Sequence, residues 1–147
     1  MSLLQHALGV GSILLNQTAE DWQSAVRLAG SGLVASGRTT AEYTEAMVAT
    51  IVELGPYVVI APGLAMPHAR PNDSVLETGM SLVTLAQPIR FGHGKNDPVR
   101  VVFALAALDH DKHLELLSEF ASKFGQPEFV NNLLTCRLED EIRNLFA

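Results

Sequence analysis

The sequence predicts an α/β protein in which helices flank a mixed β-sheet. Apolar residues recur at helical spacing in three segments, 22–37, 40–54 and 109–124. Short runs of β-branched and apolar residues, typical of buried strands, occupy 57–60, 64–66, 79–85 and 99–108. The two kinds of segment alternate in blocks along 147 residues, of which 48% are hydrophobic and 18% are charged. A chain of this size and composition is expected to form one domain, residues 1–147, around a sizeable core.

The N-terminal part of the chain predicts a short strand followed by two helices. Residues 8–15 are expected to form the strand, or a turn segment. Thr18 and the acidic pair after it are typical of the start of a helix. Thr40 is expected to cap the second helix, which carries Tyr43 and Leu54 on its buried face and ends at the Gly-Pro pair that follows.

The rest of the chain supplies most of the sheet and three further helices. Strands are expected at Tyr57–Ile60, Leu64–Met66, Gly79–Leu85 and Val99–Leu108. The last strand is apolar on both alternating faces except at Arg100, which predicts a central place in the sheet. Residues 91–97 have the composition of a loop. Helices are expected from Asp109 to Phe124, with Leu114 among its apolar positions, and at Glu128–Leu134 and Glu139–Phe146.

Charge and hydropathy argue against several classes of function. The net charge of −6 and the lack of a basic run disfavour a nucleic-acid partner. No apolar run is long enough to span a membrane, and the first residues do not resemble a signal peptide, so we expect a cytoplasmic protein. A phosphate-binding Gly-x-x-x-x-Gly-Lys loop is missing from the sequence, and we expect no cofactor. The single cysteine, Cys136, is interpreted as a packing residue.

The tripeptide Pro67-His68-Ala69 is the strongest candidate for chemistry. It places an imidazole at the exit of a short apolar strand. Histidine has an unperturbed pKa of about 6.5, so its neutral ring is a good nucleophile near pH 7. Arg70 follows two residues later and could neutralise an anionic group carried by that ring.

A second histidine, His113, lies at the head of an apolar helical face. Positions 113, 117, 120 and 124 share this face, and His113 falls in the first turn of its helix. A helix N-terminus disfavours the charged imidazolium and offers backbone N–H groups to an anion. His113 could therefore help to form a small anion site with His68 and Arg70, or could be a histidine satisfied within the core.

The remaining histidines suggest weaker hypotheses. His6 and His93 are interpreted as surface residues, and His110 as a neighbour of the cap at the start of a helix. His110 and His113, with Asp109 and Asp111 nearby, could serve a metal-dependent hydrolase, but their spacing does not match common zinc sites, and we expect no metal. A Ser-His-Asp hydrolase is less favoured still, because the sequence contains no Gly-x-Ser-x-Gly motif.

The segment Gly63–Ala69 resembles a known phosphorylation signature. Its Gly-apolar-Ala-apolar-Pro-His pattern is similar to that of the mannitol/fructose-type (type-2) enzyme IIA (EIIA) domains of the bacterial sugar phosphotransferase system (PTS). Asp97-Pro98-Val99 before an apolar strand and Lys112-His113-Leu114 at a helix start resemble a second block of the same family. The resemblance extends from about Thr18 to the C-terminal helix.

This resemblance implies a three-layer α/β/α sandwich, a single EIIA domain and a phosphoryl-carrier function. His68 matches the histidine that accepts phosphate from the phosphocarrier HPr and passes it to a cognate enzyme IIB, which serves a membrane enzyme IIC. His113 matches a second histidine that lies beside the first and helps to hold the phosphate. A homo-oligomer is compatible with this function.

One region departs from the mannitol-type pattern. Those members carry an arginine in the helix before the motif, where this chain has Thr50-Ile51-Val52. Arg70 is the expected substitute. The segment Gly55–Pro62 together with His-x-Arg-Pro resembles the ascorbate-specific branch, which implies an ascorbate-like or pentitol-like carbohydrate. The alternative function is a regulatory domain that modulates a protein partner when phosphorylated, as in nitrogen-regulatory relatives.

Overall fold

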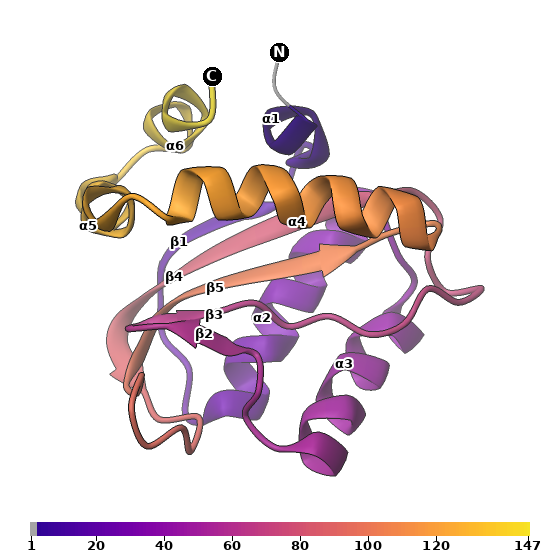
Figure 1. Ribbon diagram of the computed structural model, residues 1–147, viewed down its shortest axis with the longest axis horizontal. Helices are drawn as coiled ribbons and strands as arrows, with labels where there is room; N and C mark the ends of the chain where they lie inside the picture. Colours follow the sequence, from indigo (N-terminus) through magenta and orange to yellow (C-terminus); the bar gives the residue numbers. More distant parts are fainter. Residues whose placement is uncertain (1–2) are drawn as a thin grey trace.

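The computed structural model describes residues 3–147, apart from the side chain of Pro127, and contains a five-stranded mixed sheet (Figure 1). The strands are β1 (Ile13–Gln17), β2 (Val59–Ala61), β3 (Leu64–Ala65), β4 (Gly79–Ile89) and β5 (Val99–Ala106). Their order in the sheet is β1-β4-β5-β3-β2. The pairs β1–β4 and β3–β5 are parallel, whereas β4–β5 and β2–β3 are antiparallel. The expected α/β class with a mixed sheet is confirmed.

Helices cover both faces of this sheet (Figure 1). Helices α2 (Trp22–Ala35) and α3 (Ala41–Leu54) lie on one face. The other face carries α1 (Leu3–Ala7), α4 (His110–Phe124), α5 (Pro127–Thr135) and α6 (Glu139–Leu145). Each face has its own cluster of buried apolar residues, so the fold has three layers. No helix within residues 3–147 is both long and apolar enough to cross a membrane.

Strand β5 lies between β4 and β3 and contributes side chains to both cores. Val102, Ala104 and Ala106 belong to the cluster beneath α2 and α3. The residues that alternate with them, Val101, Phe103 and Leu105, belong to the cluster beneath α4. This alternation is the period-2 geometry of a strand buried on both faces, as its apolar run predicts. Burial of a side chain such as Phe103 stabilises the fold by about 1.5–3 kcal/mol.

Several strand limits differ from the expected ones. The first strand begins at Ile13 rather than at residue 8, since residues 8–12 form a turn segment, and residues 3–7 form a short helix that the sequence pattern did not indicate. Strand β4 does not end at Leu85 but continues past Pro88, and Ile89 pairs with Val99 after a register irregularity. Pro88 lacks an N–H and is a residue type that commonly ends a strand, but the ladder resumes beyond it. The other strands differ from their expected limits by one or two residues at an end.

Helix ends and exposed faces also differ from those that the sequence predicts. The residue that caps α2 is Asp21, whose carboxylate accepts the Ser24 N–H at 2.8 Å, and not Thr18. Leu54 and Leu114 were expected on buried helix faces but are 63% and 51% exposed. Cys136 is buried in the second core cluster, as expected of a packing residue.

Candidate functional site

The backbone of His68 is fixed at the edge of the sheet where β3 and β5 both end. His68 forms a parallel bridge with Leu105 of β5, and the N–H of Leu105 donates to the carbonyl oxygen of Pro67 at 3.0 Å. Because β3 and β5 are parallel, their carboxyl ends meet at the same edge. Helix α4 begins a few residues after β5, so the same edge also receives His113.

The tautomer of His68 follows from one contact. Its Nδ1 atom lies 2.9 Å from the carbonyl oxygen of Met66. A carbonyl oxygen can only accept a hydrogen bond, so Nδ1 must carry the ring proton. The lone pair of the neutral ring is therefore on Nε2. The ring is half-buried.

His113 presents a second imidazole to this ring. The two ring centroids are 5.3 Å apart, with an angle of 55° between the planes. His113 is half-buried in the first turn of α4, a helix capped by Asp109, whose carboxylate accepts the N–H of Lys112 at 2.8 Å. Burial, and then the charges of His68 and His110, lower the pKa of His113 below its ordinary value of 6.5. His113 is therefore neutral near pH 7.

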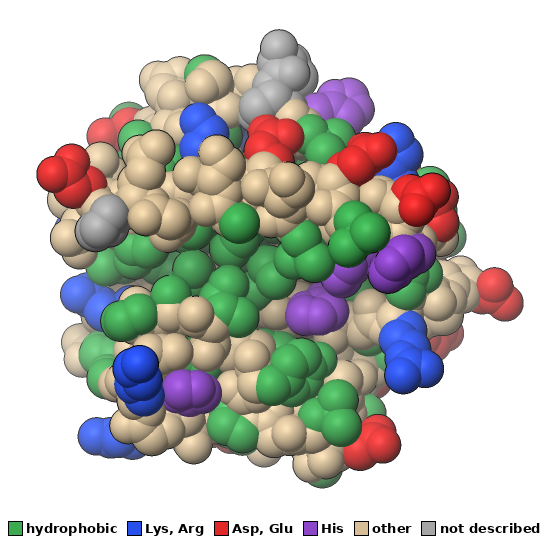
Figure 2. Space-filling view, viewed as in Figure 1, with side chains coloured by type: hydrophobic (Ala, Val, Ile, Leu, Met, Phe, Trp, Pro, Cys, Tyr) green, Lys and Arg blue, Asp and Glu red, His purple; other side chains and the backbone are tan. Residues whose placement is uncertain are grey.

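A pocket of about 730 Å³ opens over the two rings. His68, His110 and His113 line it, and Figure 2 shows histidine side chains gathered against apolar surface beside the long helix α4. Tyr57 forms part of the wall, with its ring edge-on to His68 at a centroid distance of 5.9 Å. His110, expected to be merely a surface neighbour of the helix cap, is exposed but belongs to this lining.

Few side chains that line the pocket carry a charge. Arg70 lines it and is exposed, and it is the only Lys or Arg among the described residues that do so. In the helix region where the resemblance implies an arginine in mannitol-type members, this chain has Thr50-Ile51-Val52, and Thr50 lines the pocket. The Thr50 hydroxyl donates to the Ala46 carbonyl oxygen at 2.8 Å. Glu53, one turn further along α3, adds a carboxylate to the lining.

The other predicted candidates do not form a second site. His6 is exposed on α1. His93 is half-buried rather than on the open surface, and its Nδ1 accepts the N–H groups of Lys95 and Asn96 within the 91–97 loop. Within residues 3–147, no group of three or more His, Cys, Asp or Glu side chains is placed to hold a metal ion. The His110 and His113 pair thus lacks the ligand set that a metal-dependent hydrolase would need.

Two tyrosines near His68 were missed as site residues by sequence reasoning. Tyr43 was expected only as a core residue of α3, and Tyr57 only as part of a strand. A tyrosine on an otherwise apolar helix face does carry one signal, because its hydroxyl needs a hydrogen-bond partner when buried. The identity of that partner, Ala69 in the loop after His68, is visible only in the fold.

Comparison with known proteins shows which family the chain is similar to. The model of the phosphoenolpyruvate-dependent sugar phosphotransferase system, EIIA 2, matches residues 7–147. The ascorbate-specific PTS system EIIA component of Escherichia coli K12 is 42% identical over 135 residues, which are 91% of this chain and 88% of that protein.

Solved structures show the same fold. The mannitol-specific cryptic phosphotransferase enzyme IIA CmtB of Escherichia coli is 31% identical, with a TM-score of 0.87 over 98% of this chain and 97% of that one. Enzyme IIAMTL of Escherichia coli, solved in complex with phosphorylated enzyme IIBMTL, is 27% identical, with a TM-score of 0.81 over 94% and 95%. The nitrogen regulatory protein IIA-Ntr of Neisseria meningitidis is 26% identical, with a TM-score of 0.84 over 99% and 100%.

The family model spans nearly the whole chain, and the identity to the ascorbate-specific component extends over most of both proteins. These matches confirm the resemblance that the Pro-His motif indicated. The family model and the identity to the ascorbate-specific component support a phosphoryl-carrier function in sugar transport over the regulatory alternative. The chain therefore belongs to the EIIA 2 family of the phosphoenolpyruvate-dependent sugar phosphotransferase system, as a phosphoryl carrier that works through a phosphohistidine.

Proposed function

We propose that His68 accepts the phosphoryl group on Nε2 from phosphorylated HPr and passes it to a cognate enzyme IIB. The observation that carries this assignment is the contact between Nδ1 of His68 and the carbonyl oxygen of Met66. It commits the ring proton to Nδ1 and leaves Nε2 as the nucleophile. The half-buried ring borders an open pocket, which gives a partner protein access to it.

In the acceptance step, the lone pair of Nε2 attacks phosphorus in line with the bond that breaks. A new Nε2–P bond forms while the N–P bond of the HPr phosphohistidine breaks, and the electron pair of that bond returns to the HPr ring. Nδ1 of His68 keeps its proton, so positive charge develops on the His68 ring. The Met66 carbonyl oxygen stabilises that charge through the existing hydrogen bond.

His113 is proposed to hold the phosphoryl group once it has arrived. A neutral imidazole offers one N–H, which can donate to a phosphoryl oxygen. Its lowered pKa keeps a second positive charge away from the phosphorylated His68 ring near pH 7. The distance of 5.3 Å between ring centroids leaves both rings facing one small volume of the pocket.

Arg70 is proposed as the charge partner of the phosphate. It is two residues from His68 and lines the same pocket, and the guanidinium can bind two phosphoryl oxygens at once. Thr50 cannot supply a positive charge from α3. The position of Arg70 thus supports the substitution that the sequence suggested.

Relatives of this chain support the choice of partners in this proposal. A relative of this chain has been solved as a complex of IIA with phosphorylated IIB, which supports an enzyme IIB as the acceptor here. Identity to an ascorbate-specific component supports an ascorbate-like or pentitol-like carbohydrate, taken up through a membrane enzyme IIC. A cytoplasmic location, in which HPr and the IIB domain are accessible, completes the proposal.

The test is reconstitution with enzyme I, HPr and phosphoenolpyruvate, with the modified residue located by mass spectrometry under non-acidic conditions. We expect phosphate on His68 of the wild type and no labelling of His68→Ala. His6→Ala is the matched control, because that exposed histidine lies on α1 and outside the pocket lining. Undiminished labelling of His68→Ala would overturn the assignment.

A further inference from the structure

The hydroxyl of Tyr43 lies between the chain that follows His68 and strand β5. Tyr43 comes from α3 and is 1% exposed. Its oxygen accepts the N–H of Ala69 at 3.0 Å and lies 2.7 Å from the carbonyl oxygen of Leu105, to which it donates. The carbonyl oxygen of Ala69 is a second, longer contact at 3.2 Å. One side chain thus joins the residue after His68 to its neighbour in the sheet.

This hydroxyl stands at a defined place in the strand ladder. His68 and Leu105 form a parallel bridge, and one of its two bonds, from the N–H of Leu105 to the carbonyl oxygen of Pro67, is a direct bond of 3.0 Å. In a regular parallel ladder the other bond would run directly from the N–H of Ala69 to the carbonyl oxygen of Leu105. Only the first of these bonds has good direct geometry, and the Tyr43 hydroxyl contacts both atoms of the second, at 3.0 Å from the Ala69 nitrogen and 2.7 Å from the Leu105 oxygen. The chain is therefore held directly before His68 and through a side chain after it.

We propose that Tyr43 is a positioning residue for phosphoryl transfer, which sets the direction of the His68 ring by spacing Ala69 from β5. The proposal rests on His68 being the phosphorylated residue. Tyr43 does not touch the phosphate or a partner protein, because it is buried and absent from the pocket lining. It acts through the backbone of His68, whose ring is oriented at its other side by Met66.

The Tyr43 hydroxyl stays protonated near neutral pH. Burial raises the pKa of Tyr43 to about 12, so the hydroxyl keeps the proton that it donates to Leu105. Removal of the hydroxyl would leave a buried N–H and a buried carbonyl oxygen facing each other without the atom that joins them. The two groups would then close on one another and complete the direct ladder bond. This movement would draw Ala69 toward β5 and turn the adjoining His68 ring.

The experiment compares Tyr43→Phe with wild type in phosphorylation by phospho-HPr. The maximal rate of His68 phosphorylation should fall by about 10- to 100-fold, the effect typical of a reacting group misplaced by up to about 1 Å. The KM for phospho-HPr should stay unchanged, since Tyr43 is not on the surface. The ¹⁵N spectrum of His68 should show loss of the single Nδ1–H tautomer. Thr44→Val is the matched control, because it removes a buried hydroxyl from the adjacent position of the same helix.

The possible results either support or overturn the role of Tyr43 as a positioning residue. A slower Tyr43→Phe with an altered His68 tautomer, beside a normal Thr44→Val, supports the proposal. An unchanged rate, or equal slowing of both variants, overturns it. If Tyr43→Phe does not fold, amide deuterium exchange is measured in the wild type. The proposal requires the Ala69 N–H, which donates to Tyr43, to exchange far more slowly than the Arg70 N–H, and equal exchange overturns it. Phosphate on a residue other than His68 in the wild type would instead overturn the proposed function, and a normal His68 label with an unchanged variant overturns the role of Tyr43 alone.

Discussion

The imidazole rings of His68 and His113 lie 5.3 Å apart, although one follows strand β3 and the other lies on helix α4. Their environments differ in a way that separates their roles. His68 is fixed by a backbone carbonyl at Nδ1, which leaves one nitrogen free to react. His113 has a lowered pKa, mainly because it is buried, and so remains a neutral donor or acceptor. A nucleophile and a neutral partner are thereby placed next to each other without a second fixed charge.

Replacement of His113 by alanine should impair onward transfer more than acceptance. A hydrogen bond to a charged group contributes about 1.5–3 kcal/mol, so loss of the donor to the phosphoryl oxygens should slow transfer to IIB roughly 10- to 100-fold. Acceptance from phospho-HPr should change less, because the attacking nitrogen belongs to His68. Stopped-flow measurement of the two half-reactions separates these effects. Normal rates in both half-reactions would refute a role for His113, and His6→Ala serves as the control.

Replacement of Arg70 by glutamine should slow phosphorylation and leave the fold intact. Arg70 is exposed, and substitutions at such positions usually change stability by no more than about 0.5 kcal/mol. Arg70→Lys should recover only part of the rate, because an ammonium lacks the planar pair of donors that matches a phosphate. Rates from phospho-HPr and thermal melting of the three proteins test this. An unchanged rate in Arg70→Gln would mean that another group balances the charge.

A second variant makes the Arg70 test more specific. Thr50 lines the same pocket from α3, at the region where mannitol-type members were expected to carry arginine. Thr50→Arg introduced into the Arg70→Gln protein should therefore restore part of the phosphorylation rate. Thr18→Arg, outside the pocket lining and exposed, is the control for a mere increase in net charge. Recovery by both substitutions would indicate long-range steering of HPr instead of local charge balance.

The sequence predicted the two histidines for reasons that the fold makes clear. A proline-histidine pair after a short apolar strand and a histidine heading an apolar helix face are local patterns, and parallel strands bring such positions to one edge of the sheet. The hydroxyl of Tyr43 could not be assigned in this way, because its partners, Ala69 and Leu105, are distant in sequence. Likewise, the exposure of Leu114 depends on how α4 is rotated against the sheet, which helical spacing alone does not fix.

The pKa of His113 predicts a pH dependence of stability. Its value is lowered in the folded protein, so between the folded value and the ordinary value of 6.5 the unfolded chain binds more protons. Stability should therefore fall as the pH drops below about 6.5 and level off below the folded pKa. His113→Gln should lose less stability over that range. Urea midpoints at pH 7.5 and pH 5 check this, and equal losses in both proteins would contradict it.

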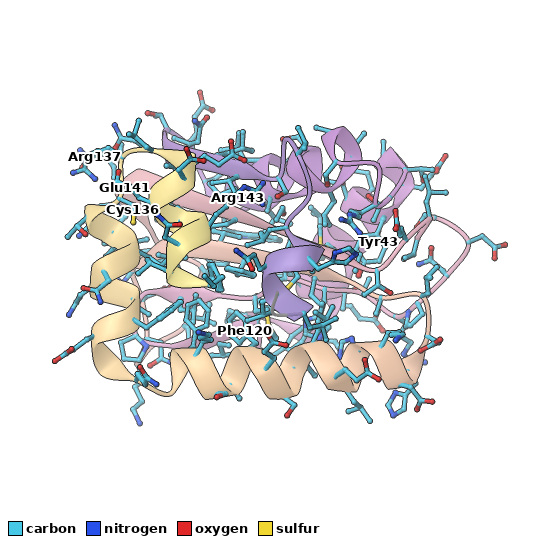
Figure 3. All side chains as sticks on the ribbon, turned by 90° about the horizontal axis from the view of Figure 1, so that it is seen from above. Tyr43, Phe120, Cys136, Arg137, Glu141 and Arg143 are labelled. Carbon is cyan, nitrogen blue, oxygen red and sulfur yellow. The ribbon has the colours of Figure 1, made fainter. Side chains whose placement is uncertain are left out.

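Phe120 should contribute to stability without affecting the chemistry. It lies on α4, the helix that carries His113 (Figure 3), and its side chain is buried, with 3% of its surface exposed. Its ring stacks on Phe124 at a centroid distance of 4.1 Å and meets Phe103 of β5 edge-on at 5.2 Å. Phe120→Ala should lower the free energy of unfolding by about 3–5 kcal/mol, the range for a large aromatic side chain removed from a core.

The folded fraction of Phe120→Ala should still be phosphorylated on His68 at close to the wild-type rate, since Phe120 is absent from the pocket lining. Urea unfolding followed by circular dichroism gives the stability, and phosphorylation at low temperature gives the rate. Tyr43 and Phe120 are both almost fully buried, but only Tyr43 contacts the chain beside His68. Comparing the two variants therefore separates a general loss of core packing from a loss at the site. If Phe120→Ala slows phosphorylation of the folded protein as much as Tyr43→Phe does, the site depends on the packing of the whole core and not on the hydroxyl between Ala69 and Leu105.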